Sequence, residues 1–141
     1  MSNLIRTYLP LDAEELRALD ETGALPARTR HAFAVTDRLR AQLPNEDDEG
    51  LEYLATQDAA TDAAARDLRV VASVDVDDDE VTERAESDAA SAVRIEGAPP
   101  RRRIASFHVL DPAGERDVDA DLELSWYDAT ELPLVREALT D

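Results

Sequence analysis

The densest group of potential metal ligands in the sequence is an acidic run over residues 75–86. Carboxylates at positions 1, 3, 5 and 12 of a loop can wrap a calcium ion. In this run those positions are held by Asp75, Asp77, Asp79 and Glu86. Position 6 is Glu80, where a calcium loop needs glycine for its sharp turn. We therefore favour a solvated acidic loop over a metal site, and we predict no cofactor.

A second set of acids alternates with apolar residues closer to the C-terminus. It comprises Asp117, Asp119, Asp121 and Glu123. On a strand these carboxylates would line one face about 7 Å apart, because each residue rises about 3.3 Å. Such a ladder is able to bind a divalent cation or a basic protein. The interpretation that we favour is the water-exposed face of an edge strand, where charge opposes aggregation.

The only basic run is Arg101, Arg102 and Arg103, directly after two prolines. Guanidinium groups bind phosphates and carboxylates through paired hydrogen bonds, so this run is a candidate anion site. The interpretation that we favour is a local counter-charge to an acidic segment nearby. No wider basic patch and no stacking aromatics flank the run, and we therefore expect no nucleic-acid partner.

Histidine and serine give no recognisable catalytic pattern. The two histidines, His31 and His108, are far apart in the sequence, so neither has a second histidine at metal-ligand spacing. Ser106 and His108 share a strand face, but no G-x-S-x-G motif surrounds the serine. Asp58 and Asp62 are one helical turn apart, and we favour two exposed carboxylates. We interpret His108 as a hydrogen-bonded core histidine, and we predict no catalytic residue.

Composition excludes several classes of protein. The 141 residues carry 33 acids and 15 bases, a net charge of −18, which disfavours nucleic acid and anionic membranes as partners. The absence of cysteine leaves no disulfide and no thiol chemistry. No apolar run approaches the length of a membrane span, and no signal-peptide pattern is present. We expect a single cytoplasmic domain, residues 1–141.

Strands and helices are predicted from apolar periodicity and from capping signals. The predicted strands cover residues 4–9, 69–77, 92–96, 104–110 and 117–127, and a short extended piece covers 31–35. Helices are predicted after the capping box at Asp12, after Thr36, over 46–68 and near the C-terminus. Pro10 is expected to end the first strand, and residues 78–91 are expected to form a mobile acidic loop.

This order of elements predicts an α+β fold, with a largely antiparallel sheet of about five strands packed against a helical block in two layers. Two packing surfaces are also predicted. In the long helix, one apolar stripe is expected to contain Leu54, Thr61, Ala65 and Leu68. In the last strand, the alternation places Trp126 in the core with the leucines before it.

Several short segments, in order, are shared with a known family. They are Tyr8-Leu9-Pro10, Ala34-Val35-Thr36 with Leu39-Arg40, Glu52-Tyr53-Leu54-Ala55, Arg103-Ile104-Ala105 leading to His108-Val109, and Trp126-Tyr127-Asp128. On these segments the chain resembles a small, uncharacterised actinobacterial family classed as a domain of unknown function. The resemblance implies an actinobacterial, cytoplasmic protein and supplies no activity.

Two hypotheses of function remain open. The first is a non-catalytic interaction or regulatory domain with a protein partner, which includes self-association as a homodimer. The second is a small enzyme or ligand- or metal-binding protein that uses clustered carboxylates and the Arg101–Arg103 run. A deep pocket that joins Arg103, His108 and several carboxylates would favour the second hypothesis.

Overall fold

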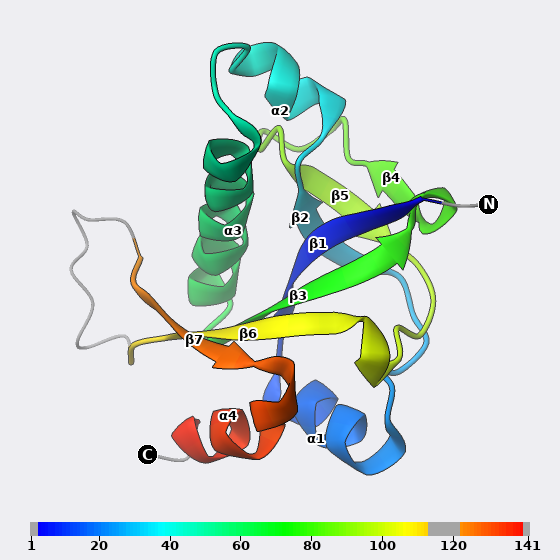
Figure 1. The fold of residues 1–141 in the computed structure, drawn as a ribbon, viewed down its shortest axis with the longest axis vertical. Helices are drawn as coiled ribbons and strands as arrows, with labels where there is room; N and C mark the ends of the chain where they lie inside the picture. Colours follow the sequence, from blue (N-terminus) through cyan, green and yellow to red (C-terminus); the bar gives the residue numbers. More distant parts are fainter. Residues whose placement is uncertain (1–2, 113–121, 140–141) are drawn as a thin grey trace.

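The computed structural model describes residues 3–112 and 122–139 of the chain (Figure 1). Its strands are β1 (Leu4–Leu11), β2 (Arg30–Ala34), β3 (Val70–Asp77), β4 (Val81–Glu83), β5 (Ala92–Ile95), β6 (Ile104–Leu110) and β7 (Leu124–Asp128). Its α-helices are α1 (Ala13–Thr22), α2 (Asp37–Gln42), α3 (Asp48–Ala65) and α4 (Leu132–Ala138). Short 3-10 turns are η1 (Asp78–Glu80), η2 (Arg101–Arg103) and η4 (Ala129–Glu131).

The strands form one antiparallel sheet in the order β4-β5-β2-β1-β3-β6-β7. The α+β class and the antiparallel sheet are confirmed, but the described residues contain seven strands instead of about five. One addition is β2, predicted only as an extended piece. The other is β4, which with η1 lies inside the segment predicted to be a mobile loop.

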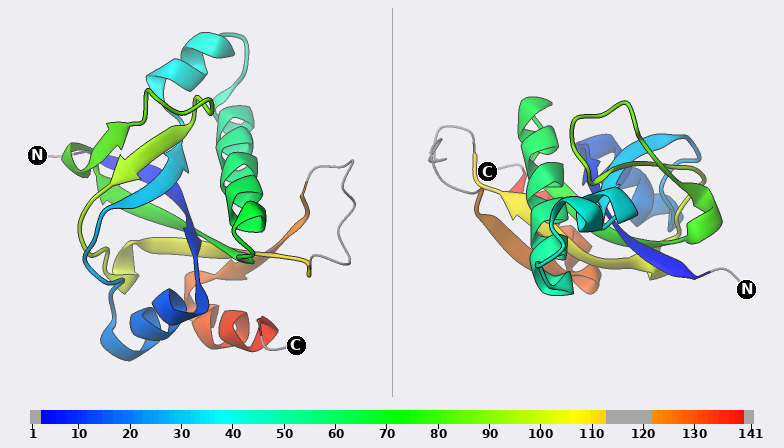
Figure 2. Two further views of the ribbon diagram at one scale, coloured as in Figure 1. Left: turned by 180° about the vertical axis from the view of Figure 1, so that it is seen from behind. Right: turned by 90° about the horizontal axis from the view of Figure 1, so that it is seen from above.

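The helices α1, α3 and α4 are divided between two apolar clusters, and Leu39 of α2 packs with Leu51 in a third, smaller one. One cluster joins α1 and α4 to the sheet around Leu9, Val70 and Phe107. The other joins alanines of α3 to the opposite face around Tyr8, Phe33 and Val71. Figure 1 and Figure 2 show α3 beside the sheet and the α1–α4 pair at its lower end. This division differs from the single helical block of the predicted two-layer arrangement.

Local capping signals predict the helix starts well. Asp12 and Glu15 form the expected capping box, and Gly23 ends α1 with a φ of 81°, which glycine adopts without steric cost. The Thr36 hydroxyl accepts a hydrogen bond from the Leu39 amide at the start of α2. Pro133 lies in the first turn of α4, where its missing N–H costs nothing.

The prediction that Pro10 ends the first strand is wrong, because β1 continues to Leu11. Proline cannot donate a ladder hydrogen bond and is tolerated where one side of a strand is unpaired. β1 pairs with β2 only at Thr7 and Tyr8, whereas Pro10 lies opposite Val71 of β3. The strand therefore behaves as an edge strand at the position of the proline.

The predicted apolar stripe of α3 is also wrong. The buried side chains of the helix are Leu51, Ala55, Ala59, Ala60 and Ala63, whereas Thr61 and Ala65 are exposed. The predicted stripe was placed on Leu54 because leucine is more hydrophobic than alanine. A row of alanine methyl groups contributes little to a hydrophobicity pattern. The expectation of close, alanine-rich packing on the sheet is confirmed, since these alanines are fully buried.

Candidate functional site

The two edges of the sheet differ in how well they are protected from pairing with another chain. β4 is only three residues long and ends on the charged Glu83, a combination that blunts an edge. β7 is five residues long, contains Trp126 and Tyr127, and also ends on an acid, Asp128. In the described part of the chain β7 pairs only with β6. Its outer side is therefore the edge more open to a further strand.

Trp126 is the largest exposed apolar side chain on this edge. Its exposure is 62%, so the prediction of a core tryptophan is wrong. Trp126 lies opposite His108 of β6, and Leu124, two residues earlier on the same face, packs against the α3 cluster. The alternation of the strand was assigned correctly, but α3 packs over β1, β2 and β3 and leaves the tryptophan uncovered.

Leu122, two residues before β7, is held in place by Gln57 of α3. The side-chain amide of Gln57 donates to the carbonyl oxygen of Leu122 at 2.8 Å, and its amide oxygen accepts from the Leu122 N–H at 3.0 Å. This pair of bonds satisfies both backbone groups of one residue and fixes the strand beside the helix. Sequence reasoning missed Gln57, because a single glutamine in a helix carries no pattern.

Polar side chains form a line across the sheet next to Trp126. The strand registers place Tyr8 opposite Ser73, Ser73 opposite Ser106, and Ser106 opposite Asp128. Tyr8 and both serines are buried, whereas Asp128 is exposed. Hydrogen bonds to the Thr130 N–H and hydroxyl lower the pKa of Asp128. The line therefore ends in a fixed negative charge at the open edge.

His108 joins the neighbouring strands through two serines. Its Nε2 atom lies 3.1 Å from the Ser73 hydroxyl and 3.1 Å from the Ser106 hydroxyl. Burial lowers the pKa of His108 below its usual value, so the ring is neutral near pH 7. The serines are 3% and 7% exposed, too covered to act as nucleophiles on a substrate. The arrangement accords with a hydrogen-bonded structural histidine.

Of the four candidate metal ligands, Asp75 and Glu86 have arginine partners, whereas Asp77 and Asp79 lie in β3 and η1. Arg6 binds both carboxylate oxygens of Asp75, at 2.8 and 3.1 Å, and this hydrogen bonding raises the pKa of Arg6. Asp77 ends β3, Asp79 lies in η1, and Glu86 pairs with Arg84. Across residues 3–112 and 122–139, no three His, Asp or Glu side chains are grouped to hold a metal ion.

The other predicted acids do not converge either. Asp117, Asp119 and Asp121 lie outside the described residues, and Glu123 is exposed directly before β7. On α3, Asp58 accepts from the Ser91 hydroxyl at 2.6 Å and Asp62 pairs with Arg66 at 3.0 Å. Each of these two carboxylates therefore has its own partner.

The arginine run is divided between two places. Arg101 lies 3.9 Å from Asp20 of α1. Arg102 and Arg103 line a small pocket of about 150 Å³ with acids of β3 and η1, among them Asp77 and Glu80. The run is thus divided between α1 and the end of β3.

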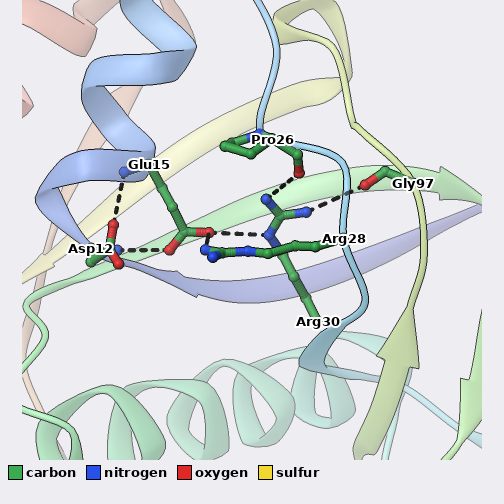
Figure 3. Close-up of polar contacts among 6 residues, drawn as sticks. All are labelled: Asp12, Glu15, Pro26, Arg28, Arg30 and Gly97. Carbon is green, nitrogen blue, oxygen red and sulfur yellow. Dashed lines mark hydrogen bonds and ion pairs between the residues drawn. The ribbon is translucent and has the colours of Figure 1, made fainter.

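A buried ion network fixes the connector between α1 and β2 (Figure 3). The Glu15 carboxylate accepts hydrogen bonds from the Asp12 N–H and from Arg30 Nε at 3.1 Å each, and it also binds Arg28. The other nitrogens of Arg30 donate to the carbonyl oxygens of Pro26 and Gly97. Because Glu15 and Arg30 are both buried and paired, this network stabilises the fold, and its outer side lines a pocket of about 390 Å³.

The chain is similar to a known protein family. The model of a family of unknown function (DUF6912) matches residues 5–135, from β1 into α4. No curated protein and no solved structure matches the chain. Within the described residues, no helix is both long and apolar enough to cross a membrane.

Proposed function

We propose that this chain, which belongs to the DUF6912 family of unknown function, is a non-catalytic protein-interaction domain. The partner contributes an extended, basic segment that pairs with the open edge of β7 and packs on Trp126. The observation that carries the proposal is the 62% exposure of the single tryptophan of the chain, on the longer of the two edge strands.

The edge and the tryptophan supply two different contributions to binding. Backbone groups along a free strand edge pair with an extended segment and give affinity that is independent of its side chains. Trp126 adds a rigid aromatic surface, the kind of side chain that dominates the energy of protein interfaces. Gln57 holds the strand in place before binding, which reduces the entropy cost of association.

The charge of the molecule selects the partner. With a net charge of −18, two copies of the chain repel each other, and a basic segment is attracted. Acids stand at both ends of β7, with Glu123 before it and Asp128 as its last residue, and both are exposed. Lysine or arginine side chains of an added strand would meet them, so we favour a basic partner over self-association.

The alternative of a small enzyme or ligand- or metal-binding protein has less support at the predicted residues. Arg101 approaches Asp20 of α1, whereas Arg102 and Arg103 line a pocket beside β3, so the run does not form one anion site. His108 and its serines are bonded to one another beneath the surface. The buried serines therefore give no nucleophile access to a substrate.

The proposal is tested with a short fluorescein-labelled peptide in which arginine and valine alternate, and with a matched peptide that carries glutamate for arginine. Fluorescence anisotropy measures binding to the full chain. We expect the basic peptide to bind and the acidic peptide to show no binding. Higher salt should weaken the basic complex, because exposed charges are screened.

Variants separate binding at β7 from general attraction to an acidic protein. Trp126→Ser should weaken the basic peptide about tenfold or more, since it removes an aromatic anchor. Leu43→Ser is the control, because Leu43 is also exposed and follows α2, at the opposite end of the molecule from β7 (Figure 1). Equal affinity of the two variants, or no binding of the basic peptide, would overturn the proposal.

A further inference from the structure

The hydrogen bonds of β6 indicate which backbone groups of β7 face the open edge. The Leu110 N–H donates to the carbonyl oxygen of Arg69 at 2.7 Å, so Leu110 bonds toward β3. Successive residues of a strand direct their backbone groups to opposite sides. Val109 therefore bonds toward β7, to the residue opposite it, Ser125. The residues on either side of Ser125 accordingly direct their N–H and C=O groups to the open edge.

These two residues, Leu124 and Trp126, lie between positions whose outward groups are already bonded. Before them, the Leu122 N–H and carbonyl oxygen are bonded to the α3 glutamine. After them, the Asp128 N–H donates to the Glu131 carboxylate at 2.9 Å. This last bond requires the Asp128 N–H to point away from β6, in agreement with the alternation. Within the described part of the chain, the open edge therefore presents the backbone of Leu124 and Trp126 to a further strand.

The side chains along this edge place acidic and apolar groups in a fixed order. Leu124 packs against the α3 cluster, and alternation puts Trp126 and Asp128 on the same face of the sheet. Leu122 also packs against that cluster, so Glu123, which lies between the two leucines, faces the other side. Both acids are exposed. An added strand therefore meets one acid at each end, on opposite faces, and two apolar side chains between them.

We propose that the segment bound by β7 has the order basic, any, apolar, any, apolar, basic, and that it runs antiparallel to β7. The first basic residue lies opposite Asp128 and the last lies opposite Glu123. The two apolar residues lie opposite Trp126 and Leu124. This inference rests on the function proposed above and specifies the partner.

The direction of the added strand follows from the rest of the sheet. Every described pair of neighbouring strands is antiparallel, and antiparallel pairing is the more stable per residue. A parallel strand would need the reverse order, which is basic, apolar, any, apolar, any, basic. The two directions therefore predict different partner sequences.

Three fluorescein-labelled peptides of identical composition and charge test the order by anisotropy. Arg-Thr-Val-Thr-Val-Arg fits the proposed order, and Arg-Val-Thr-Val-Thr-Arg fits a parallel strand. Thr-Arg-Val-Thr-Val-Arg moves the first base to the other face. General attraction to the acidic chain is equal for all three. We expect the first peptide to bind about two- to fivefold more tightly than the others, the effect of one exposed ion pair.

Backbone methylation tests which groups pair with β7. In the proposed complex the valine N–H groups donate to β7, whereas the N–H of the threonine between the valines points away. N-methylation of either valine should weaken binding of the first peptide at least about tenfold, because it removes a hydrogen bond and leaves a carbonyl oxygen unpaired. N-methylation of that threonine should change the affinity less than about twofold.

A double-mutant cycle identifies the base that meets Asp128. Asp128→Asn should weaken the first peptide about two- to fivefold, and this effect should vanish when glutamine replaces its first arginine but persist when glutamine replaces its last. Glu83→Gln is the matched control, because Glu83 is an exposed acid at the end of the other edge strand. It should leave all affinities unchanged.

The outcomes separate this inference from the function on which it rests. Equal binding of the three peptides, tolerance of methylated valines, or coupling of Asp128 to the last arginine would contradict the proposed order. If binding nevertheless depends on Trp126, the proposed function is unaffected. If Trp126→Ser leaves the affinity of all three peptides unchanged, both proposals are wrong.

Discussion

The environment of His108 should affect how the stability of the protein depends on pH. Burial lowers its pKa in the folded state, so the unfolded chain takes up a proton at a higher pH than the folded chain does. Stability linked to His108 is therefore complete above about pH 6.5, the unperturbed histidine value, and is lost as the pH falls toward the folded pKa.

We predict that the free energy of unfolding falls more between pH 7 and pH 5 in the wild type than in His108→Gln. The glutamine amide can bond to Ser73 and Ser106 but does not titrate. The extra slope is at most about 1.4 kcal/mol per pH unit, because one proton is involved. Urea unfolding at each pH measures it, and the carboxylates cancel in the comparison. Parallel curves would mean that His108 titrates normally.

The arginines around Glu15 offer a matched pair in one network. The Arg30 side chain is 5% exposed and that of Arg28 is 50% exposed, although both bind the same carboxylate. We predict that Arg30→Gln costs about 3 kcal/mol, because it leaves a buried charge and two carbonyl oxygens poorly paired. Arg28→Gln should cost less than about 1 kcal/mol, as exposed ion pairs do. Similar losses in urea unfolding would show that burial does not control this network.

At the scale of elements, β6 and β7 lie side by side but differ in how deeply their aromatic residues are buried. Phe107 is fully buried, whereas Trp126 is 62% exposed. We predict that Phe107→Ala costs about 3–5 kcal/mol, and that Trp126→Ser changes stability by less than about 1 kcal/mol. Thermal and urea unfolding check both variants. A large loss of unfolding free energy in Trp126→Ser would show that the tryptophan is buried, which would contradict its proposed role in an interface.

The accuracy of prediction for each element followed the range of the interaction that determines it. Helix starts at Asp12 and Thr36 depend on bonds within three residues, and the sequence displays both partners. The predicted bounds of β6, residues 104–110, are confirmed, because apolar residues on both faces mark this segment as a strand. Pro10 and Trp126 depend on which strand or helix lies alongside, and that information comes from residues more than sixty positions away in the chain.

The candidate site was less predictable than the fold for the same reason. The shared face of Ser106 and His108 follows from their spacing, but the contact with Ser73 requires the register of β3 and β6. The division of Arg101 from Arg102 and Arg103 depends on where α1 and β3 lie. Gln57 stabilises the structure through one partner that is distant in the sequence, Leu122. The residues next to Gln57 in the sequence therefore give no sign of its role.

At the scale of the whole molecule, the net charge of −18 should limit stability at low salt. Folding brings the acids together, and the Debye length falls from about 30 Å at 0.01 M salt to about 10 Å at 0.1 M. We predict that the melting temperature rises with sodium chloride at constant pH. Screening of exposed ion pairs opposes this rise by only about 0–1 kcal/mol per pair. A flat or falling melting temperature would show that the acids are already compensated.

The central claim, strand addition at β7, is tested most directly by amide hydrogen exchange with and without the arginine–valine peptide. Pairing a new strand with β7 protects backbone N–H groups on its open side, so exchange should slow within Leu124–Asp128. The short edge strand β4, Val81–Glu83, should exchange as before. Unchanged exchange in β7, or protection confined to β4, would contradict the proposed function.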